Sequence, residues 1–368
     1  MLRNFVSFLL LSLFFQTTHA QMLTTIADGG NKKASISERI GITDVSIHYD
    51  RPAVKKREGK IWGELVPYGF TDLGFGTSKA APWRAGANEN TSISFSTDVQ
   101  VEGKLLPAGT YALFMAMAPA EATLIFSKNH TSWGSYFYDP KEDALRVTVK
   151  TIPTADSRER LTYEFSDQQE NSAIITLRWE KLGIPFKVSV DYISTQLASY
   201  RQELRSEKGF RWEAWVEAID FCIKRNVNLE EALQWSDYAM NAVFVGERNF
   251  RTLSARASVL KKLNRSTEAD QLMKEAIPLG TMLEIHVYGR QLIDEKKYAE
   301  ALQVFKINAE KNPGKFTPNM GLMRGYSANG DLKNALKYAR LALPLAPENQ
   351  KKMVEGFIQT LESGKEIN

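Results

Sequence analysis

The chain has 368 residues, of which 43% are hydrophobic, so it is long enough to bury a large core without cross-links. Its 47 basic and 43 acidic residues give a net charge of +4, and the absence of a dense basic stripe argues against nucleic-acid binding. The only cysteine, Cys222, cannot form an intrachain disulfide, so burial must supply the stability.

The first 20 residues are typical of a cleavable export signal. Arg3 supplies a positive charge, residues 5–15 form an apolar run, and Thr18 and Ala20 are small residues suited to a cleavage site. This apolar run is short of the about 20 residues that a membrane-spanning helix needs. We therefore expect a mature chain that begins at Gln21 and has no membrane span. Its expected location is the periplasm, the outer membrane surface or the exterior of a Gram-negative bacterium.

From Ile42 to about residue 190, apolar and polar residues alternate with a period of two, as in half-buried strands. The runs are 45–49, 92–96, 99–102, 110–115, 122–126, 132–138, 145–150, 161–165, 173–179 and 186–190. The clearest pair of strands, 173–179 and 186–190, is joined through 181–185. Many short strands separated by Gly, Pro and Asp predict an antiparallel β-sandwich-like domain over residues 21–193.

Several motifs in this half carry a resemblance to a known family. They are Gly41-Ile42-Thr43-Asp44-Val45, Tyr49-Asp50-Arg51-Pro52, Trp83-Arg84-Ala85-Gly86-Ala87-Asn88-Glu89-Asn90-Thr91 and Leu106-Pro107-Ala108-Gly109-Thr110-Tyr111. Over residues 36–191 the chain resembles DUF2911, an exported bacterial domain of unknown function. Residues 70–82 look like an insertion into the family pattern. The resemblance implies no activity that could be assigned to particular residues.

The densest polar cluster beside aromatic residues in this half defines the candidate ligand site. Its members are Arg51, Trp83, Arg84, Asn88, Glu89 and Asn90. In a functional interpretation, the guanidinium, amide and carboxylate groups beside Trp83 hydrogen-bond a carbohydrate or another small polar ligand. In a structural interpretation, which we favour, Arg84 and Glu89 form an ion pair and the Asn side chains cap the turn before Ser92.

Catalytic motifs are absent from the sequence. His48, His130 and His286 do not have the spacing of metal ligands, and no nucleophile motif with Gly-x-Ser-x-Gly spacing occurs. Glu64 and Glu89 could serve as the acid pair of a glycosidase, but two acids in a long chain are no evidence for one. We therefore predict no catalytic residue, metal or cofactor, and an unrecognised hydrolase stays an alternative. Cys222 lies in an apolar helical pattern, which favours a small buried hydrophobe over a nucleophilic thiol.

After Asp191 the hydrophobic period changes from two towards 3.6, which predicts a helical domain over residues 194–368. The expected helices are 194–206, 212–223, 228–239, 251–263, 268–277, 283–294, 298–310, 318–328, 332–343 and 350–361. Asn228 and Glu231 have the spacing of a capping box at the start of one of these helices.

A weak self-similarity with a period of 34 residues lies near the C-terminus. Ala301 recurs as Ala335, and Pro313 recurs as Pro347. This period, with a small residue inside the second helix and a proline after it, resembles the tetratricopeptide repeat. An irregular helical bundle is the alternative.

The expected function follows from these two halves. Helical repeats of this type build interaction surfaces more often than catalytic sites. We therefore expect an exported, non-catalytic binding or scaffold protein of the cell envelope, with a protein partner held by the helical repeats. The alternatives are a β domain that binds a small ligand or carbohydrate, supported by the helices, and an unrecognised hydrolase.

Overall fold

The computed structural model describes residues 30–367, so the expected export signal lies outside the described residues. The chain divides into two compact units, one ending at Thr195 and the other beginning at Gln196. Each unit has hydrophobic clusters of its own. No helix in the described range is long and apolar enough to cross a membrane.

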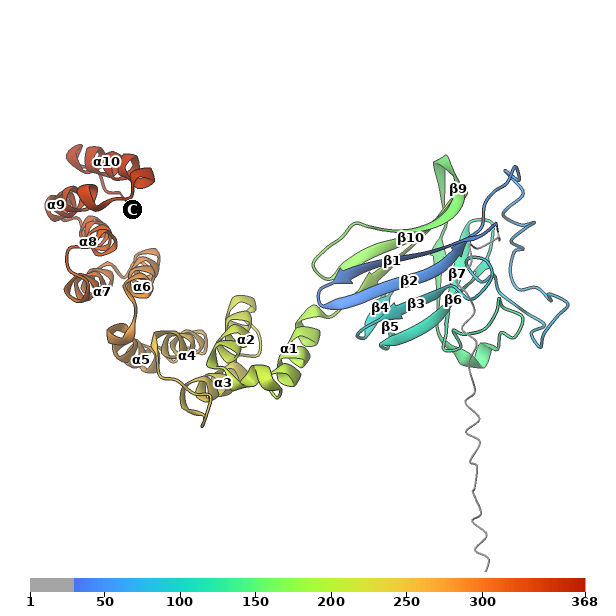
Figure 1. Cartoon of the computed structure of the whole chain (residues 1–368), viewed down its shortest axis with the longest axis horizontal. Coiled ribbons are helices and arrows are strands. Elements are labelled where there is room, and N and C mark those ends of the chain that lie inside the picture. Colours follow the sequence, from blue (N-terminus) through green and yellow to red (C-terminus); the bar gives the residue numbers. More distant parts are fainter. Residues whose placement is uncertain (1–29, 368) are drawn as a thin grey trace, which may run out of the picture. The chain divides into compact units, whose positions relative to one another are not determined.

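The N-terminal unit consists mainly of antiparallel strands (Figure 1). They are β1 (Lys32–Ile40), β2 (Thr43–Arg51), β3 (Ser92–Phe95), β4 (Val99–Val101), β5 (Lys104–Leu106), β6 (Gly109–Met117), β7 (Glu121–Ser127), β8 (Asp143–Lys150), β9 (Ile152–Ser166) and β10 (Ser172–Ser189). Within the described residues they form a six-stranded sheet, β1-β2-β3-β6-β7-β8, and a four-stranded sheet, β5-β4-β10-β9. The neighbouring strands pair antiparallel, which confirms the predicted antiparallel β domain.

The inner faces of both sheets contribute to one hydrophobic cluster. On β2, Val45, Ile47 and Tyr49 are buried in this cluster, whereas Ser46 and His48 lie on the opposite face of the strand. Because successive side chains of a strand point to opposite faces, this alternation fixes which face of β2 is inside. The outer face is left free to carry polar groups.

The predicted pair of strands at 173–179 and 186–190 is wrong, because both belong to the single strand β10. Glu180 has a φ of +50°, and the register with β9 shifts on each side of it. This bulge bends the strand without ending it. Gly183 and Pro185, which suggested a turn, lie beyond the bulge, where β10 continues towards its pairing with β4.

The predicted strand 132–138 is also wrong. This segment consists of turns, and its only strand-like feature is an isolated bridge between Glu89 and Trp133. Conversely, β1 was not predicted, because its outer positions carry charged and small polar residues that mask the alternation. Such residues are common on edge strands, where they discourage pairing with other chains.

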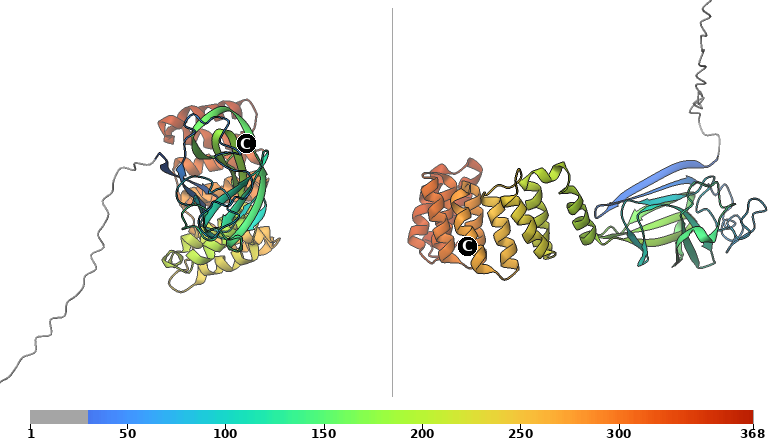
Figure 2. Two further views of the ribbon diagram at one scale, coloured as in Figure 1. Left: turned by 90° about the vertical axis from the view of Figure 1, so that its right-hand side faces the viewer. Right: turned by 90° about the horizontal axis from the view of Figure 1, so that it is seen from below.

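The C-terminal unit is helical, with helices stacked side by side in an array (Figure 2). The helices are α1 (Tyr192–Glu203), α2 (Trp212–Arg225), α3 (Leu229–Asn241), α4 (Phe250–Lys262), α5 (Ser266–Leu279), α6 (Met282–Asp294), α7 (Tyr298–Lys311), α8 (Phe316–Ala328), α9 (Leu332–Ala342) and α10 (Glu348–Glu362). Short 3₁₀ helices lie at Glu207–Phe210 and Leu343–Leu345 of this unit, and a third lies at Pro140–Glu142 of the N-terminal unit. The predicted solenoid-like arrangement is confirmed, and every predicted helix is present.

The predicted capping box at Asn228 is wrong. Asn228 has a φ of +52°, and its side chain makes no capping hydrogen bond to the α3 backbone. Instead its amide donates to Glu231 Oε2 at 2.7 Å. The Glu231 carboxylate also accepts from the Arg201 guanidinium at 2.7 Å, which draws it away from the Asn228 backbone. Reciprocal capping boxes occur at the starts of α4 and α6 instead.

Small residues lie where the helices of the last units touch. Phe305 of α7 is fully buried, and a Cβ at Gly289 of α6 would lie 2.4 Å from its ring. A Cβ at Gly321 of α8 would lie 2.5 Å from the same ring. Ala301 and Ala335, the residues related by the 34-residue repeat, are both 0% exposed. The small residues of the repeat pattern are thus required by close helix packing.

We predict that Ala335→Leu destabilises the helical unit by about 1–3 kcal/mol, because a fully buried site has no room for the added carbons. Thermal melts followed by circular dichroism should show earlier loss of helix with the β signal unchanged. Lys337→Leu, which places the same side chain at an exposed position of α9, is the control. A melt of Ala335→Leu that matches the parent would contradict the packing of α9 described here.

We also predict that the two units resist proteolysis separately. Arg205 and Lys208 are exposed in the segment after α1, so brief trypsin treatment should cut there and leave two stable fragments. Mass spectrometry of the fragments identifies the cut. A chain that stays intact and melts in a single transition by every probe would show that the units fold as one.

Candidate functional site

The polar cluster predicted from the sequence is centred on one tight loop, residues 83–91. Backbone pairing with β6 anchors both ends of this loop. Trp83 exchanges two hydrogen bonds with Met115, at 2.9 and 2.8 Å, and the Thr91 carbonyl accepts from Leu113 at 2.8 Å. A loop held at both ends presents its side chains in fixed positions, which a binding site requires.

Trp83, Arg84 and Asn88 line a cavity of about 340 Å³, here called the tryptophan cavity. Trp179 of β10 also lines it, with its ring stacked on that of Trp83 at a centroid distance of 6.1 Å. The Arg84 guanidinium donates to the Asn88 carbonyl at 2.8 Å and lies 5.5 Å from the centroid of the Tyr136 ring. These contacts hold Arg84 at the wall of the cavity.

The expected ion pair between Arg84 and Glu89 is wrong. Glu89 Oε1 accepts instead from Lys33 Nζ of β1 at 2.8 Å. The physical reason is the hairpin of β1 and β2, which brings an ammonium group to Glu89 from a strand that the sequence pattern did not reveal.

Arg51 lies outside the site. Its guanidinium donates to the Leu161 carbonyl and to Thr162 Oγ1 of β9, both at 2.9 Å. It therefore ties β2 to β9 and does not line the cavities around residues 83–91. Glu64, the other acid considered for a glycosidase pair, is exposed and lines neither of these cavities.

Glu89 and Asn90 line a different cavity of about 410 Å³, here called the acid cavity. Lys33 of β1 and His48 and Asp50 of β2 also line it. The register of the hairpin places Lys33 directly opposite Asp50, so both side chains emerge on the same face. Asp50 is only 5% exposed, although it lies on the outer face of the sheet, because the loop 83–91 covers it.

Asp50 and Glu89 both line the acid cavity, and their carboxyl groups affect each other's pKa. Burial, and then the hydrogen bond to Glu89, raise the pKa of Asp50 above its ordinary value. The hydrogen bond from Lys33 lowers the pKa of Glu89. Asp50 Oδ1 and Glu89 Oε2 are buried without a hydrogen-bond partner among the described residues. A proton on Asp50 that is donated to Glu89 would satisfy both oxygens.

Asp50 and Lys33 are site residues that the sequence analysis missed. Asp50 stands in the motif Tyr49-Asp50-Arg51-Pro52, directly before the arginine that was selected. The alternation of β2 places Asp50 on the same face as His48, opposite Tyr49, and this signal was available from the sequence. Lys33 could not be found without the unpredicted strand β1.

The predicted insertion, residues 70–82, forms a loop closed by a bridge between Thr71 and Ala81. The Phe75 ring packs against Tyr136 at a centroid distance of 5.4 Å. Because Tyr136 in turn lies against Arg84, this loop supports the wall of the tryptophan cavity from outside.

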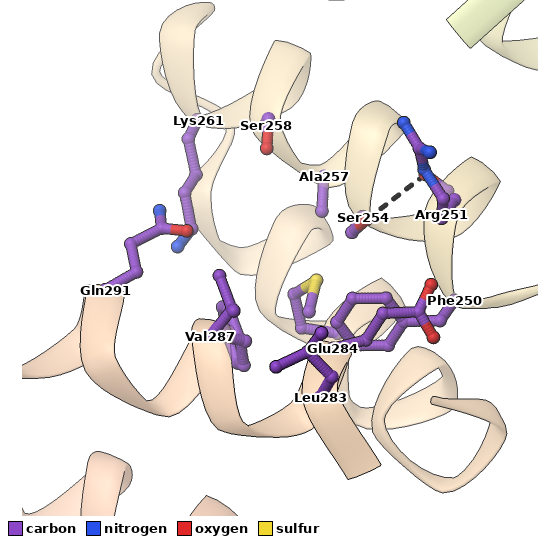
Figure 3. Close-up of a pocket in the computed structure, with 12 residues that line it drawn as sticks. Phe250, Arg251, Ser254, Ala257, Ser258, Lys261, Leu283, Glu284, Val287 and Gln291 are labelled. Atoms are coloured by element: carbon purple, nitrogen blue, oxygen red, sulfur yellow. Dashed lines mark hydrogen bonds between the residues drawn. The ribbon is translucent and has the colours of Figure 1, made fainter. Parts of the chain in front are cut away.

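A separate groove of about 360 Å³ lies between α4 and α6 of the helical unit, here called the helical groove (Figure 3). Phe250 and Ala257 of α4 and Met273 of α5 are buried residues that line it. Leu283 and Val287 of α6 project into it from the other side and are 62% and 57% exposed. The groove is therefore apolar and open.

Cys222 is fully buried, and this burial raises the pKa of its thiol to about 11. The thiol therefore stays protonated near neutral pH, which is the state of a structural cysteine. The interpretation of Cys222 as a small buried hydrophobe is confirmed. Within residues 30–367, no group of three or more His, Cys, Asp or Glu side chains is arranged to hold a metal ion.

Residues 31–188 match the family described as "Protein of unknown function (DUF2911)", which confirms the resemblance seen in the sequence motifs. Among solved structures, "MamA RS-1 ArsTM double mutant" is 15% identical, with a TM-score of 0.28, and covers 42% of this chain and 93% of its own. "MamA 41-end from Desulfovibrio magneticus RS-1" is 16% identical, with a TM-score of 0.28, and covers 41% and 93%. No curated protein matches the chain.

We predict that Asp50 makes stability fall as pH rises. The folded chain keeps the Asp50 proton above pH about 4, where the unfolded chain has already lost it, so deprotonation favours unfolding. Asp50→Asn retains a donor towards Glu89 and cannot ionise. Urea unfolding between pH 4.5 and 7.5 should show a shallower pH dependence, with a gain of about 1 kcal/mol at neutral pH.

Asp156→Asn, at an exposed position of β9, is the matched control and should change nothing. An Asp50→Asn variant with the same pH dependence as the parent, or with lower stability at neutral pH, would contradict the raised pKa of Asp50.

Proposed function

We propose that the protein is an exported, non-catalytic binding or scaffold protein of the bacterial cell envelope, in which the helical repeats hold a partner protein. The observation that carries this proposal is the helical groove between α4 and α6. The proposal of export rests on the sequence of the first 20 residues.

One face of α6 packs against neighbouring helices, and another face is exposed to solvent. Ile285 and Gly289 are buried against neighbouring helices, and Gly289 contacts Phe305 of α7. Leu283 and Val287 lie one turn apart on another face, where folding leaves them in water. Burying apolar surface contributes about 25 cal/mol per Å² to binding. A partner that fills the groove therefore gains the hydrophobic stabilisation of side chains that folding leaves exposed.

The edges of the groove are polar and give a partner its orientation. Lys261 and Gln291 lie at one end of the groove, and Arg251 and Glu284 lie at the other (Figure 3). Charged groups of both signs around an apolar centre match an amphipathic segment, whose apolar face enters the groove and whose polar flanks meet the edges. We therefore expect the bound segment of the partner to be amphipathic.

A second candidate function rests on the tryptophan cavity. Its stacked rings and the Arg84 and Asn88 groups form an apolar wall with a few polar groups, which is the usual character of a small-ligand site. The buried Trp179 Nε1 has no hydrogen-bond partner among the described residues and is a free donor. A carbohydrate or another small polar ligand is the occupant that these groups support.

The partner proposal is tested by photo-crosslinking in the native cells. We expect a photoreactive residue at Val287 to form an adduct with one envelope protein, and Leu283→Asp to reduce that adduct about tenfold. A photoreactive residue at Leu341, an exposed position of α9 outside the groove, is the matched control for the first step. Leu341→Asp is the control for the second.

Adduct formation at both positions, or an adduct that survives Leu283→Asp, would mean that the groove does not select the partner. Absence of any adduct at Val287 in cells that produce the protein at its natural level would also refute the proposal.

A further inference from the structure

Three residues that line the acid cavity each carry a buried oxygen atom without a hydrogen-bond partner among the described residues. These atoms are Asp50 Oδ1, Glu89 Oε2 and Asn90 Oδ1. The orientation of the Asn90 amide is fixed, because its Nδ2 donates to the Gly134 carbonyl at 2.6 Å. Asn90 Oδ1 is therefore an acceptor, and the two carboxyl oxygens are acceptors once both groups are ionised. Buried acceptors are nearly always satisfied in folded proteins. The chemical complement of this cavity is a group rich in donors.

The charges around the cavity favour a cation. The two carboxyl groups of the lining are Asp50, on β2, and Glu89, in the loop 83–91. The other charged or titratable residues of the lining are Lys33 on β1 and His48 and Tyr49 on β2. An anion would meet the ionised Glu89 carboxylate, so repulsion disfavours it.

Lys33 already shows which kind of group the site accepts. Its ammonium donates to Glu89 Oε1 at 2.8 Å, but its side chain is 72% exposed. It satisfies only Oε1 of Glu89 and leaves Glu89 Oε2, Asp50 Oδ1 and Asn90 Oδ1 without a partner. A second ammonium in the cavity has three donors, which matches these three acceptors.

A divalent metal ion fits the cavity less well. Calcium takes six to eight oxygen ligands, and the Lys33 ammonium beside Glu89 would repel a doubly charged ion. Among the described residues no cluster of three or more His, Cys, Asp or Glu side chains could hold a metal.

We propose that the acid cavity, lined by Asp50, Glu89 and Asn90, is a binding site for a small ligand that carries a primary ammonium group. This site lies in the β unit and is independent of the helical groove. A cation bound beside Asp50 favours the ionised form of its carboxyl group. Binding therefore releases the Asp50 proton where it is present, and the affinity rises with pH.

The test is isothermal titration calorimetry of the full mature chain with three amines and their neutral analogues. The pairs are ethanolamine with ethylene glycol, putrescine with 1,4-butanediol, and glucosamine with glucose. We expect at least one amine to bind with one-to-one stoichiometry and about tenfold tighter than its analogue, since a hydrogen bond to a charged group is lost in the analogue. The affinity should rise between pH 5 and pH 7.5.

Variants identify the site. Asp50→Asn and Glu89→Gln should each weaken amine binding about tenfold, whereas the exposed Asp156→Asn should not. Circular dichroism shows that each variant is folded. If no amine of the three binds better than its neutral analogue, or if both carboxyl variants bind as the parent does, the proposal fails. Calcium binding that depends on Asp50 in the absence of amine binding would assign the cavity to a metal and overturn it as well.

Discussion

The ring of Phe305 lies against Gly289 and Gly321 so closely that a single added carbon at either glycine would collide with it. This contact fixes α6 against α7 and α8. It also determines what α6 can do, because a helix held by one face must leave another face outward. Leu283 and Val287 lie on that outward face. The packing constraint inside the array and the apolar groove on its surface are thus consequences of one arrangement.

In the β unit, the hairpin of β1 and β2 determines which side chains meet at the acid cavity. Its register places Lys33 beside Asp50, and the loop 83–91 lies over Asp50 while the Lys33 side chain stays exposed. The sheet supplies rigidity and the loop supplies the second carboxyl group, so the acid cavity needs both. The tryptophan cavity lies on another side of the same loop. The loop 83–91, anchored at both ends on β6, therefore contributes lining residues to both the acid cavity and the tryptophan cavity.

The sequence predicted the helices closely because their signals are local: a period near 3.6 and small residues at fixed spacing. It misread β10, because a bulge at Glu180 followed by Gly183 and Pro185 has the same local composition as a turn between strands. The contact between Asp50 and Glu89 was out of reach for a different reason. It depends on which strands become neighbours, and no local pattern carries that information.

The burial of Cys222 affects how the protein responds to oxidation during storage. In the folded chain the thiol is enclosed within the helical unit and meets neither oxidants nor other thiols. Once α2 opens, the thiol is exposed, and an external oxidant can take two electrons from a pair of opened chains and join them through a disulfide. Because Cys222 is fully buried in the native packing, a chain joined in this way cannot refold around it until the bond is reduced. A disulfide-linked dimer in a stored sample would therefore indicate that some chains had unfolded around Cys222.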